Sequence, residues 1–278
     1  MLQEPDDLGE LTHDAIAGTF RIAQRRHGHR YSIDDVLTAW EAVRAVEDRH
    51  ARTAASEQSS VLGAQAASSP PLRCLELGSG IGSVLLMLAY KLPAARFVAV
   101  EAQRNSFRLL RDNVHHNGLH PRVTLVHGDL RDEVTPQLGP FDLVTGTPPY
   151  VLPGSATPSS DSQKAYCRQE LRGGVEDYLA AIGRVLAVDG VGVVCADARY
   201  PGRVFSGAER AGLQVARQRD VVPRAGKKGA LFAVFTVVSA RAAKPSFTCE
   251  PAWVARDEAG ERTADYLAVR SFFGIEPR

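Results

Sequence analysis

Residues 76–82 (ELGSGIG) combine three glycines with a carboxylate, and they follow an apolar run and precede a helical pattern. Glycines in such a turn let the backbone bend tightly and approach a ligand closely. Dinucleotide-binding enzymes use the spacing G-x-G-x-x-G, whereas this chain has G-x-G-x-G with Ser83 at the sixth position. Glu76, two positions before the first glycine, suits an amine-bearing ligand without phosphate there, such as the methionine part of S-adenosylmethionine. The alternative is a βα turn that binds nothing.

Carboxylates stand at the ends of three successive predicted strands, at Glu76, Glu101 and Asp129. Glu101 occupies the place where a carboxylate accepts hydrogen bonds from ribose hydroxyls, each worth roughly 1.5–3 kcal/mol, although nicotinamide enzymes share this feature. Asp129 could accept from the exocyclic amine of an adenine, with Leu130 packing on the ring, or it could cap a helix. Because doubly wound sheets bind ligands at strand carboxyl ends, the ordered set predicts a nucleotide-type cofactor.

The fourth predicted strand leads into Thr147-Pro148-Pro149-Tyr150. Pro148 has no N–H and a fixed φ, so its carbonyl can point outward as an acceptor, and Tyr150 offers a face on which a planar group can stack. Methylation of a planar amine needs this arrangement, because acceptors on the two N–H groups turn the nitrogen lone pair toward the methyl group. Alignment of this kind can supply up to ~7–11 kcal/mol of the barrier, without a metal or a strong base.

Together with residues 27–40 (HGHRYSIDDVLTAW) and Arg168-Gln169-Glu170, these motifs resemble those of class I S-adenosylmethionine-dependent methyltransferases. Within that class the chain is most similar to the bacterial tRNA1(Val) adenine-37 N6-methyltransferase family, over about residues 25–239. The resemblance implies S-adenosylmethionine as cofactor and the N6 amine of an RNA adenine, most simply in tRNA, as the methyl acceptor. It implies cofactor binding by Tyr31, Asp34, Glu76, Gly78, Ser79, Gly80, Gly82, Glu101, Ala102, Asp129, Leu130 and Thr147, and catalysis at Thr147, Pro148, Pro149 and Tyr150.

The family has asparagine where this chain has Thr147. The asparagine amide oxygen accepts a hydrogen bond from the target amine, whereas a threonine hydroxyl can accept only if it places its own proton elsewhere. Loss of one good acceptor is worth about 1 kcal/mol, and more in a preorganised site. The departure leaves three possibilities: a shifted pocket, a different substrate, or weak activity.

The chain has almost no net charge: its 33 Lys and Arg residues and 32 Asp and Glu residues leave a formal charge of +1. No field of the whole protein draws it to nucleic acid, so an RNA partner needs a local patch. The candidates are two basic runs, Arg25, Arg26, His27 and Arg30 before the cofactor-covering segment and Lys227 and Lys228 in a late hairpin. Ordinary solvated charge is the alternative for each run. A single-stranded loop would let an adenine splay out and stack on Tyr150.

The elements that must hold these motifs follow from short apolar runs alternating with amphipathic segments. Strands are predicted at 73–78, 96–101, 122–129, 141–146, 190–196, 213–221 and 230–238, and helices at 33–48, 82–90, 103–117, 175–186 and 203–211. This alternation predicts an α/β fold: a doubly wound, mostly parallel, seven-stranded Rossmann-like sheet, with its last two strands forming an antiparallel hairpin at the edge.

The 278 residues, 44% of them hydrophobic, are enough for one core with additions. We divide them into an N-terminal arm and cofactor-covering helix (1–50), an Ala/Ser-rich linker or insertion (51–71), the methyltransferase core (72–240) and a tail packed on the core (241–278). Neither a bilayer-spanning run nor a signal peptide is apparent, so we expect a cytoplasmic protein with no membrane partner. The four cysteines lack metal-ligand spacing, so we expect no metal.

Three alternatives remain at this point. A protein-glutamine N5-methyltransferase would use the same P-P-Y chemistry, but its usual helical recognition domain is larger than the one helix predicted before residue 51. A non-catalytic scaffold could keep the cofactor fold while Thr147 weakens the chemistry. A nicotinamide oxidoreductase is disfavoured by Ser83, Glu76 and the T-P-P-Y motif.

Overall fold

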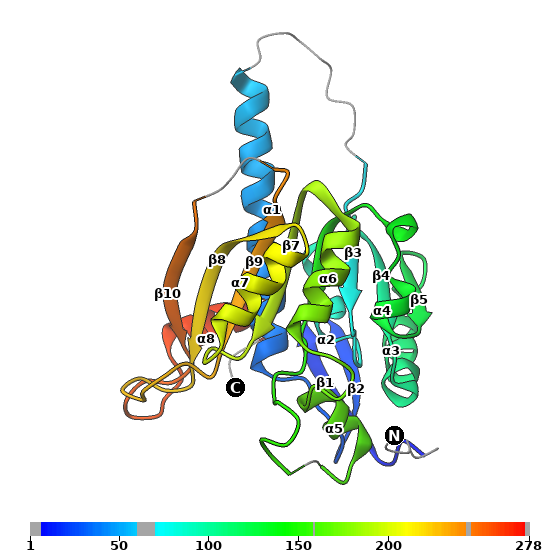
Figure 1. Ribbon diagram of the computed structural model, residues 1–278. Coiled ribbons are helices and arrows are strands. Elements are labelled where there is room, and N and C mark those ends of the chain that lie inside the picture. Colours follow the sequence, from blue (N-terminus) through cyan, green and yellow to red (C-terminus); the bar gives the residue numbers. More distant parts are fainter. Residues whose placement is uncertain (1–6, 60–69, 158, 243–245, 276–278) are drawn as a thin grey trace.

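The computed structural model describes residues 7–59, 70–157, 159–242 and 246–275, and within them an eight-stranded sheet forms the centre (Figure 1). Its spatial order is β10-β8-β9-β7-β6-β3-β4-β5. The strands are β3 (Arg73–Leu77), β4 (Arg96–Glu101), β5 (Val123–His127), β6 (Phe141–Gly146), β7 (Leu186–Ala196), β8 (Leu213–Val222), β9 (Phe232–Ser239) and β10 (Thr248–Val254). Neighbours pair in parallel except at β9, which is antiparallel to both β7 and β8. The predicted doubly wound, mostly parallel α/β sheet is confirmed.

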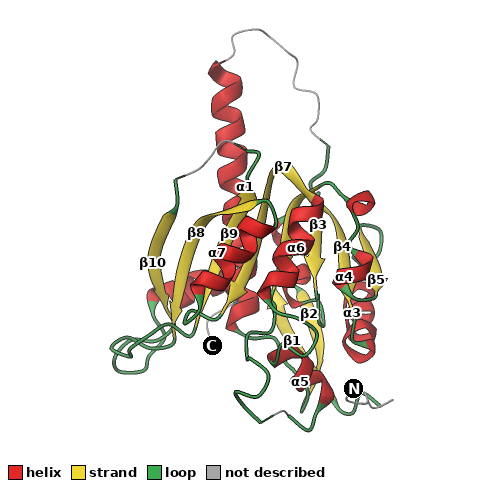
Figure 2. Cartoon of the chain, in the orientation of Figure 1, coloured by secondary structure: helices red, strands yellow, loops and turns green. Residues whose placement is uncertain are grey.

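Helices cover both faces of the sheet (Figure 2). They are α1 (Ile33–Ser59), α2 (Ser83–Lys91), α3 (Arg104–His116), α4 (Leu130–Glu133), α5 (Ser162–Arg168), α6 (Val175–Val185), α7 (Pro201–Arg210) and α8 (Ala264–Phe272), with a 3-10 turn at Pro136–Leu138. The buried apolar residues form two clusters, one beneath α1, α2, α3 and α8 and the other beneath α4, α6 and α7. No helix in the described ranges is long and apolar enough to cross a bilayer.

Helix α1 is longer than the predicted 33–48. It continues to Ser59 and so takes up the first part of the segment interpreted as a linker, while residues 60–69 lie outside the described residues. The helix continues past residue 48 because residues 51–56 contain three alanines, and alanine is the strongest helix former. Helix α1 also extends beyond the sheet (Figure 1).

The segment 241–278 adds regular structure that the sequence pattern did not predict. Strand β10 pairs in parallel with β8, so the sheet has eight strands instead of seven and the β8–β9 hairpin does not form its edge. Trp253 of β10 and Phe273 after α8 are buried in the same cluster as α1. An edge strand of mostly exposed residues carries too little apolar alternation to be recognised from sequence.

A second sheet was also missed, the antiparallel hairpin of β1 (Leu11–Ala17) and β2 (Phe20–Arg25). It is joined to the core by Asn113 of α3, whose side chain accepts from the Ala23 N–H over 2.7 Å and donates to the Ala23 carbonyl over 3.0 Å. The same amide donates to the Ile81 carbonyl over 2.8 Å, in the glycine-rich turn. This buried side chain therefore connects the hairpin both to α3 and to the glycine-rich turn.

Candidate active site

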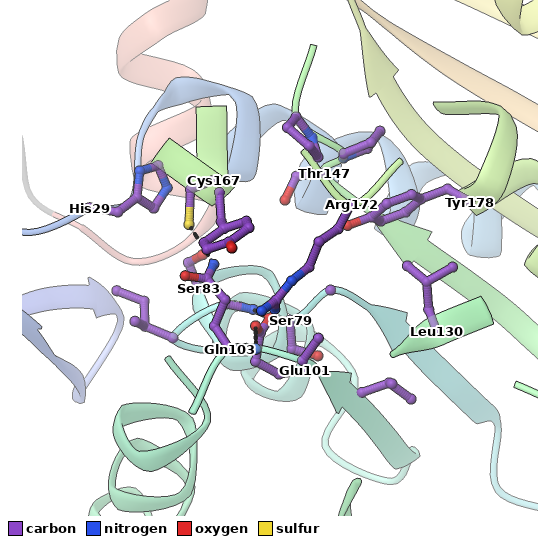
Figure 3. Close-up of a pocket in the computed structure, with 18 of the residues that line it drawn as sticks. His29, Ser79, Ser83, Glu101, Gln103, Leu130, Thr147, Cys167, Arg172 and Tyr178 are labelled. Atoms are coloured by element: carbon purple, nitrogen blue, oxygen red, sulfur yellow. Dashed lines mark hydrogen bonds between the residues drawn. The ribbon is translucent and has the colours of Figure 1, made fainter. Parts of the chain in front are cut away.

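A cavity lies where the first parallel strands end, bordered by the segment before α1 and by the loop around α5 (Figure 3). Most of the residues assigned from sequence to the cofactor and to the reaction line it. They are Tyr31, Asp34, Gly78, Ser79, Gly80, Glu101, Ala102, Asp129, Leu130, Thr147, Pro148 and Pro149. Glu76, Gly82 and Tyr150 do not line this cavity, and their positions are described below.

The glycine-rich turn has the backbone conformation that its composition requires. Gly78 and Gly80 have φ values of 56° and 57°, and Gly82 has 89°, in the left-handed region that side chains other than glycine rarely adopt. A Cβ on Gly78 would lie 2.1 Å from the Tyr178 hydroxyl oxygen, so this position also lacks room for a side chain. Gly82 is the N-cap of α2 and joins the turn to that helix. The N–H groups of Ser79, Gly80 and Gly82 all donate within the protein, so they hold the turn in place at the cavity wall.

Glu101 is fixed by two backbone donors. Its Oε2 accepts from the Gly80 N–H over 2.7 Å and its Oε1 from the Gln103 N–H over 2.6 Å. The side chain of Gln103 donates in turn to Cys167 Sγ over 3.4 Å, which connects this edge of the cavity with α5. Glu101 is only 4% exposed, and a carboxylate oxygen has two lone pairs and can accept from more than one donor.

Asp129 lines the cavity and also caps a helix. It is the N-cap of α4, accepts from the Arg131 N–H over 3.0 Å and forms an ion pair with the Arg131 guanidinium. The hydrogen bonds from Arg131 hold the pKa of Asp129 below its ordinary value. Of the two interpretations drawn from sequence, the helix cap is present, and the adenine contact stays a prediction for the same side chain.

Glu76 lies beneath the cavity wall instead of in it. Its side chain is buried, and its Oε2 has no hydrogen-bond partner among the described residues. Burial and the nearby Asp35 carboxylate raise the pKa of Glu76 well above its ordinary value. A buried carboxylate oxygen without a partner is costly, so this position favours the approach of a cation or a donor.

Asp35 was not among the residues singled out from sequence, but it lines the cavity close to Glu76. Burial and the Asp34 carboxylate raise the pKa of Asp35 to about 7. Its Oδ2 accepts from the Ser32 N–H over 3.0 Å, and its Oδ1 accepts from the Thr147 hydroxyl over 3.3 Å. The only signal in the sequence was its place three residues after Ser32, which indicated a helix start and nothing about chemistry.

The T-P-P-Y loop is held by the segment that follows α5. The Val151 N–H donates to the Arg168 carbonyl, and the Glu170 N–H donates to the Val151 carbonyl, each over 3.0 Å. Glu170 also forms an ion pair with Arg203 of α7. These contacts give Arg168-Gln169-Glu170 a positioning role next to the cavity.

Tyr150 faces a second cavity, which adjoins the first and shares His29, Tyr31, Asp34 and Cys167 with it. Its ring stacks on Phe232, with centroids 6.4 Å apart and planes at 23°. Burial raises the pKa of Tyr150 above its ordinary value, so the hydroxyl stays neutral. The expected stacking face therefore belongs to the outer cavity and not to the cofactor-type one.

Basic side chains gather around this outer cavity. Arg26, His27, Arg30, Lys164 and Arg168 line it, and so does His29. The first three were predicted from the basic run, whereas the two on α5 were missed because they stand apart in the sequence. Arg26 and Arg30 form ion pairs with Glu10 and Asp14, and such exposed pairs are worth only ~0–1 kcal/mol.

Three residues of the two basic runs, Arg25, Lys227 and Lys228, do not line the outer cavity. Arg25 has a structural role, because its side chain is only 12% exposed and its guanidinium forms an ion pair with Asp161 over 2.9 Å and donates to the Leu8 carbonyl. Lys227 and Lys228 are exposed in the β8–β9 loop, which lies at the same end of the sheet as α5 (Figure 1). They line neither cavity, so an RNA contact there stays a prediction.

Arg172 was also missed by the sequence analysis. Its side chain extends into the first cavity (Figure 3), and its guanidinium stacks on the Tyr166 ring at 4.2 Å. Arg172 lies four residues after Arg168, in a loop without apolar periodicity. Only its place in the fold brings it to the cavity.

Comparisons with known proteins agree with this geometry. A family described as "Methyltransferase domain" matches residues 74–153, which span the glycine-rich turn and the T-P-P-Y motif. The tRNA1(Val) (adenine(37)-N6)-methyltransferase of Aeromonas hydrophila is 33% identical over 171 residues, which cover 60% of this chain and 70% of the relative. This chain belongs to that methyltransferase family.

Two further relatives and one solved structure are also similar to this methyltransferase. The enzyme of the same name from Bacteroides thetaiotaomicron is 28% identical, over 60% of this chain and 69% of its own length. The release factor glutamine methyltransferase of Chlorobaculum tepidum is 30% identical, but over only 45% of this chain and 41% of its own length. A protein from Agrobacterium tumefaciens described as a predicted O-methyltransferase has the same fold, with a TM-score of 0.57 at 15% identity over 88% of this chain and 99% of its own. The methyltransferase thus has the class I fold and binds S-adenosylmethionine.

Proposed function

We propose that this methyltransferase transfers the methyl group of S-adenosylmethionine to the exocyclic N6 amine of an adenine in RNA, with tRNA as the first candidate. One observation carries the proposal: the Thr147-Pro148-Pro149 wall of the cofactor-type cavity adjoins an outer cavity that combines the Tyr150 ring with four Arg and Lys residues and two histidines. The names of the relatives that match over 60% of the chain support the same substrate class.

The residues around the first cavity fit the cofactor chemically. Glu101 has two oriented carboxylate oxygens for the ribose hydroxyls, and Asp129 with Leu130 suits the adenine. Asp34 lines the cavity at the start of α1, and Glu76 is buried behind the cavity wall, so their carboxyl groups suit the positive ammonium and sulfonium groups.

The target amine would lie between two acceptors. The Pro148 carbonyl and the Thr147 hydroxyl oxygen would accept its two N–H groups, which directs the nitrogen lone pair toward the cofactor. When bound, S-adenosylmethionine supplies an electrophilic methyl group: the amine lone pair forms the new N–C bond, the C–S pair stays on sulfur, and the methylated amine loses one proton. Positioning supplies most of the rate acceleration in this proposal.

The outer cavity would hold the RNA. Its cations come from the segment before α1 and from α5, so phosphates can be bound on two sides of the Tyr150 ring. The Tyr150 ring stacks on Phe232 and lines the outer cavity, so it would be the ring on which the adenine stacks. A single-stranded loop is the RNA form that presents an adenine in this way at least cost.

A protein-glutamine N5-methyltransferase is the second candidate. It is favoured by the release factor relative and by the shared chemistry of a planar amide amine. The four Arg and Lys residues around the outer cavity favour RNA over a neutral glutamine side chain.

The proposal is tested by incubating the purified protein with S-adenosylmethionine and total tRNA and measuring methylated nucleosides by mass spectrometry. We expect N6-methyladenosine, and its absence with every tRNA tested would overturn the proposal. A glutamine-containing release factor peptide is assayed in parallel, and methylation of that peptide alone would establish the second candidate.

A further inference from the structure

Thr147 needs an acceptor for its own hydroxyl proton before its oxygen can accept from a substrate. A hydroxyl has one proton and two lone pairs, so the direction of the O–H bond decides whether the oxygen turns a lone pair or a proton toward the amine. In the structure Asp35 Oδ1 lies 3.3 Å from Thr147 Oγ1 and accepts this proton. Both residues line the cavity, so the remaining lone pairs of Thr147 can face it.

Asp35 is itself held in place. Its second oxygen, Oδ2, accepts from the Ser32 N–H at the start of α1, and the Ser83 hydroxyl also bonds to the carboxylate. Asp35 is 7% exposed, so water cannot readily replace it as the partner of Thr147. Residues 112 positions apart in the sequence are thereby joined at the reaction centre.

We propose that Asp35 is a positioning residue that lets Thr147 take the role of the asparagine in related N-P-P-Y sequences. The inference rests on the proposed function in one respect, that the methyl acceptor is a planar amine. The Asp35 carboxylate takes the Thr147 proton in a hydrogen bond, and the Thr147 oxygen then accepts one N–H of the target. After methyl transfer the proton lost by the amine passes to Thr147 Oγ1 while the original hydroxyl proton passes to Asp35 Oδ1, which balances the charge.

A double-mutant cycle tests the inference. Asp35→Asn leaves no anionic acceptor for the hydroxyl proton, so we expect kcat to fall by about tenfold or more, in the range seen when one preorganised hydrogen-bonding group is removed. In a Thr147→Asn background the amide oxygen accepts without help, and the same Asp35→Asn change is expected to cost less than about threefold. Two independent roles would give equal losses in both backgrounds, and that result would overturn the inference.

A second pair of variants tests the inference without relying on Asp35→Asn, which could fail to fold. Thr147→Ser keeps the hydroxyl, and Thr147→Val keeps the shape but removes the acceptor. We expect the serine variant to retain at least about tenfold more activity than the valine variant. Equal activities would contradict the inference, because the hydroxyl would then be unnecessary.

Cofactor affinity provides a readout other than activity. The dissociation constant of S-adenosylmethionine, measured by calorimetry, is expected to change by a smaller factor than kcat in the Thr147 variants and in Asp35→Asn. A large loss of binding in Asp35→Asn would assign Asp35 to the cofactor instead and would overturn the inference. The cycle is run on whichever substrate the wild type methylates, RNA or glutamine peptide, so failure of the RNA proposal can be told apart from failure of this inference. A wild-type protein that methylates neither substrate would contradict the RNA proposal and this inference together.

Discussion

The backbone N–H of Gly80 donates to Glu101 Oε2 over 2.7 Å, although the two residues are 21 positions apart. The bond joins the turn after β3 to the end of β4 and fixes the carboxylate at the cavity wall. It is possible because adjacent parallel strands end at the same edge of the sheet. The glycine-rich turn and the acid of the next strand therefore form one unit.

Loss of the Glu101 carboxylate should weaken the cofactor complex. Glu101→Ala removes acceptors worth roughly 1.5–3 kcal/mol, so we expect the dissociation constant of S-adenosylmethionine to rise at least about tenfold by calorimetry. Asp112→Ala is the matched control, because Asp112 lies on α3 with a 54% exposed side chain. If both variants bound the cofactor equally well, Glu101 would have no part in the site.

The buried carboxylate of Glu76 should cost stability at neutral pH. Because its pKa is raised in the folded protein, its contribution is favourable below the unfolded pKa and disappears as pH rises through the folded pKa. Glu76→Gln should therefore raise the melting temperature of the cofactor-free protein at pH 8 and change it little near pH 4. The same substitution should reduce the stabilisation given by S-adenosylmethionine. A melting temperature that is lower at pH 8 would contradict the raised pKa.

Activity should depend on the ionisation of Asp35. The ionised carboxylate accepts the Thr147 proton, whereas the protonated acid does so poorly, so kcat should rise with pH to a plateau, with an inflection at or below about 7. The other titratable groups that interact with Asp35 are Asp34, Glu76, Cys167, Cys195 and Tyr150. The pKa values of both thiols and of the tyrosine are raised, so these groups stay neutral over the range tested.

The Thr147→Asn variant separates Asp35 from its neighbours in the pH profile. The inflection should disappear in this variant, because an amide oxygen accepts in either state of Asp35. An inflection that is unchanged in Thr147→Asn would have to come from another group.

The basic residues on α5 should contribute to RNA affinity and its salt dependence. The double variant Lys164→Ala/Arg168→Ala should weaken tRNA binding and reduce the slope of log affinity against log salt by about 1 for each phosphate that is no longer bound. Arg96→Ala is the control, since Arg96 is exposed at the amino end of β4, away from the carboxyl end of that strand and the cavity beside it. Fluorescence anisotropy at several salt concentrations gives both quantities, and equal slopes for both proteins would argue against an RNA contact at α5.

Asn113 should be important for stability and for the site together. Asn113→Ala leaves buried backbone groups of Ala23 and Ile81 without their partner, which we expect to lower the free energy of unfolding by about 2–4 kcal/mol. Asn117→Ala removes a similar bridge to Arg21 at a more exposed place and should cost about 1 kcal/mol. Urea unfolding measures both, and similar losses would show that burial of the bridge is unimportant.

The sequence by itself determined the sheet and the main motifs. Short apolar runs alternating with amphipathic helices define a parallel sheet, and its carboxyl edge collects Glu101, Asp129 and the T-P-P-Y loop in any fold of that class. Local signals sufficed there because each motif directly follows its own strand. The same reasoning missed the β1–β2 hairpin, β10 and α8, whose residues have little apolar alternation and are held by contacts distant in sequence.

Only the tertiary structure decided the partners of the site residues. In the folded protein Tyr150 lines the outer cavity, Arg25 forms an ion pair with Asp161, and Arg172 lines the first cavity. The tertiary structure also placed Asp35 against Thr147, which supplies the proton acceptor that a threonine requires at that position. The physical reason is that hydrogen bonds and ion pairs depend on distances of about 3 Å, and no periodicity in a sequence specifies which distant segments approach so closely.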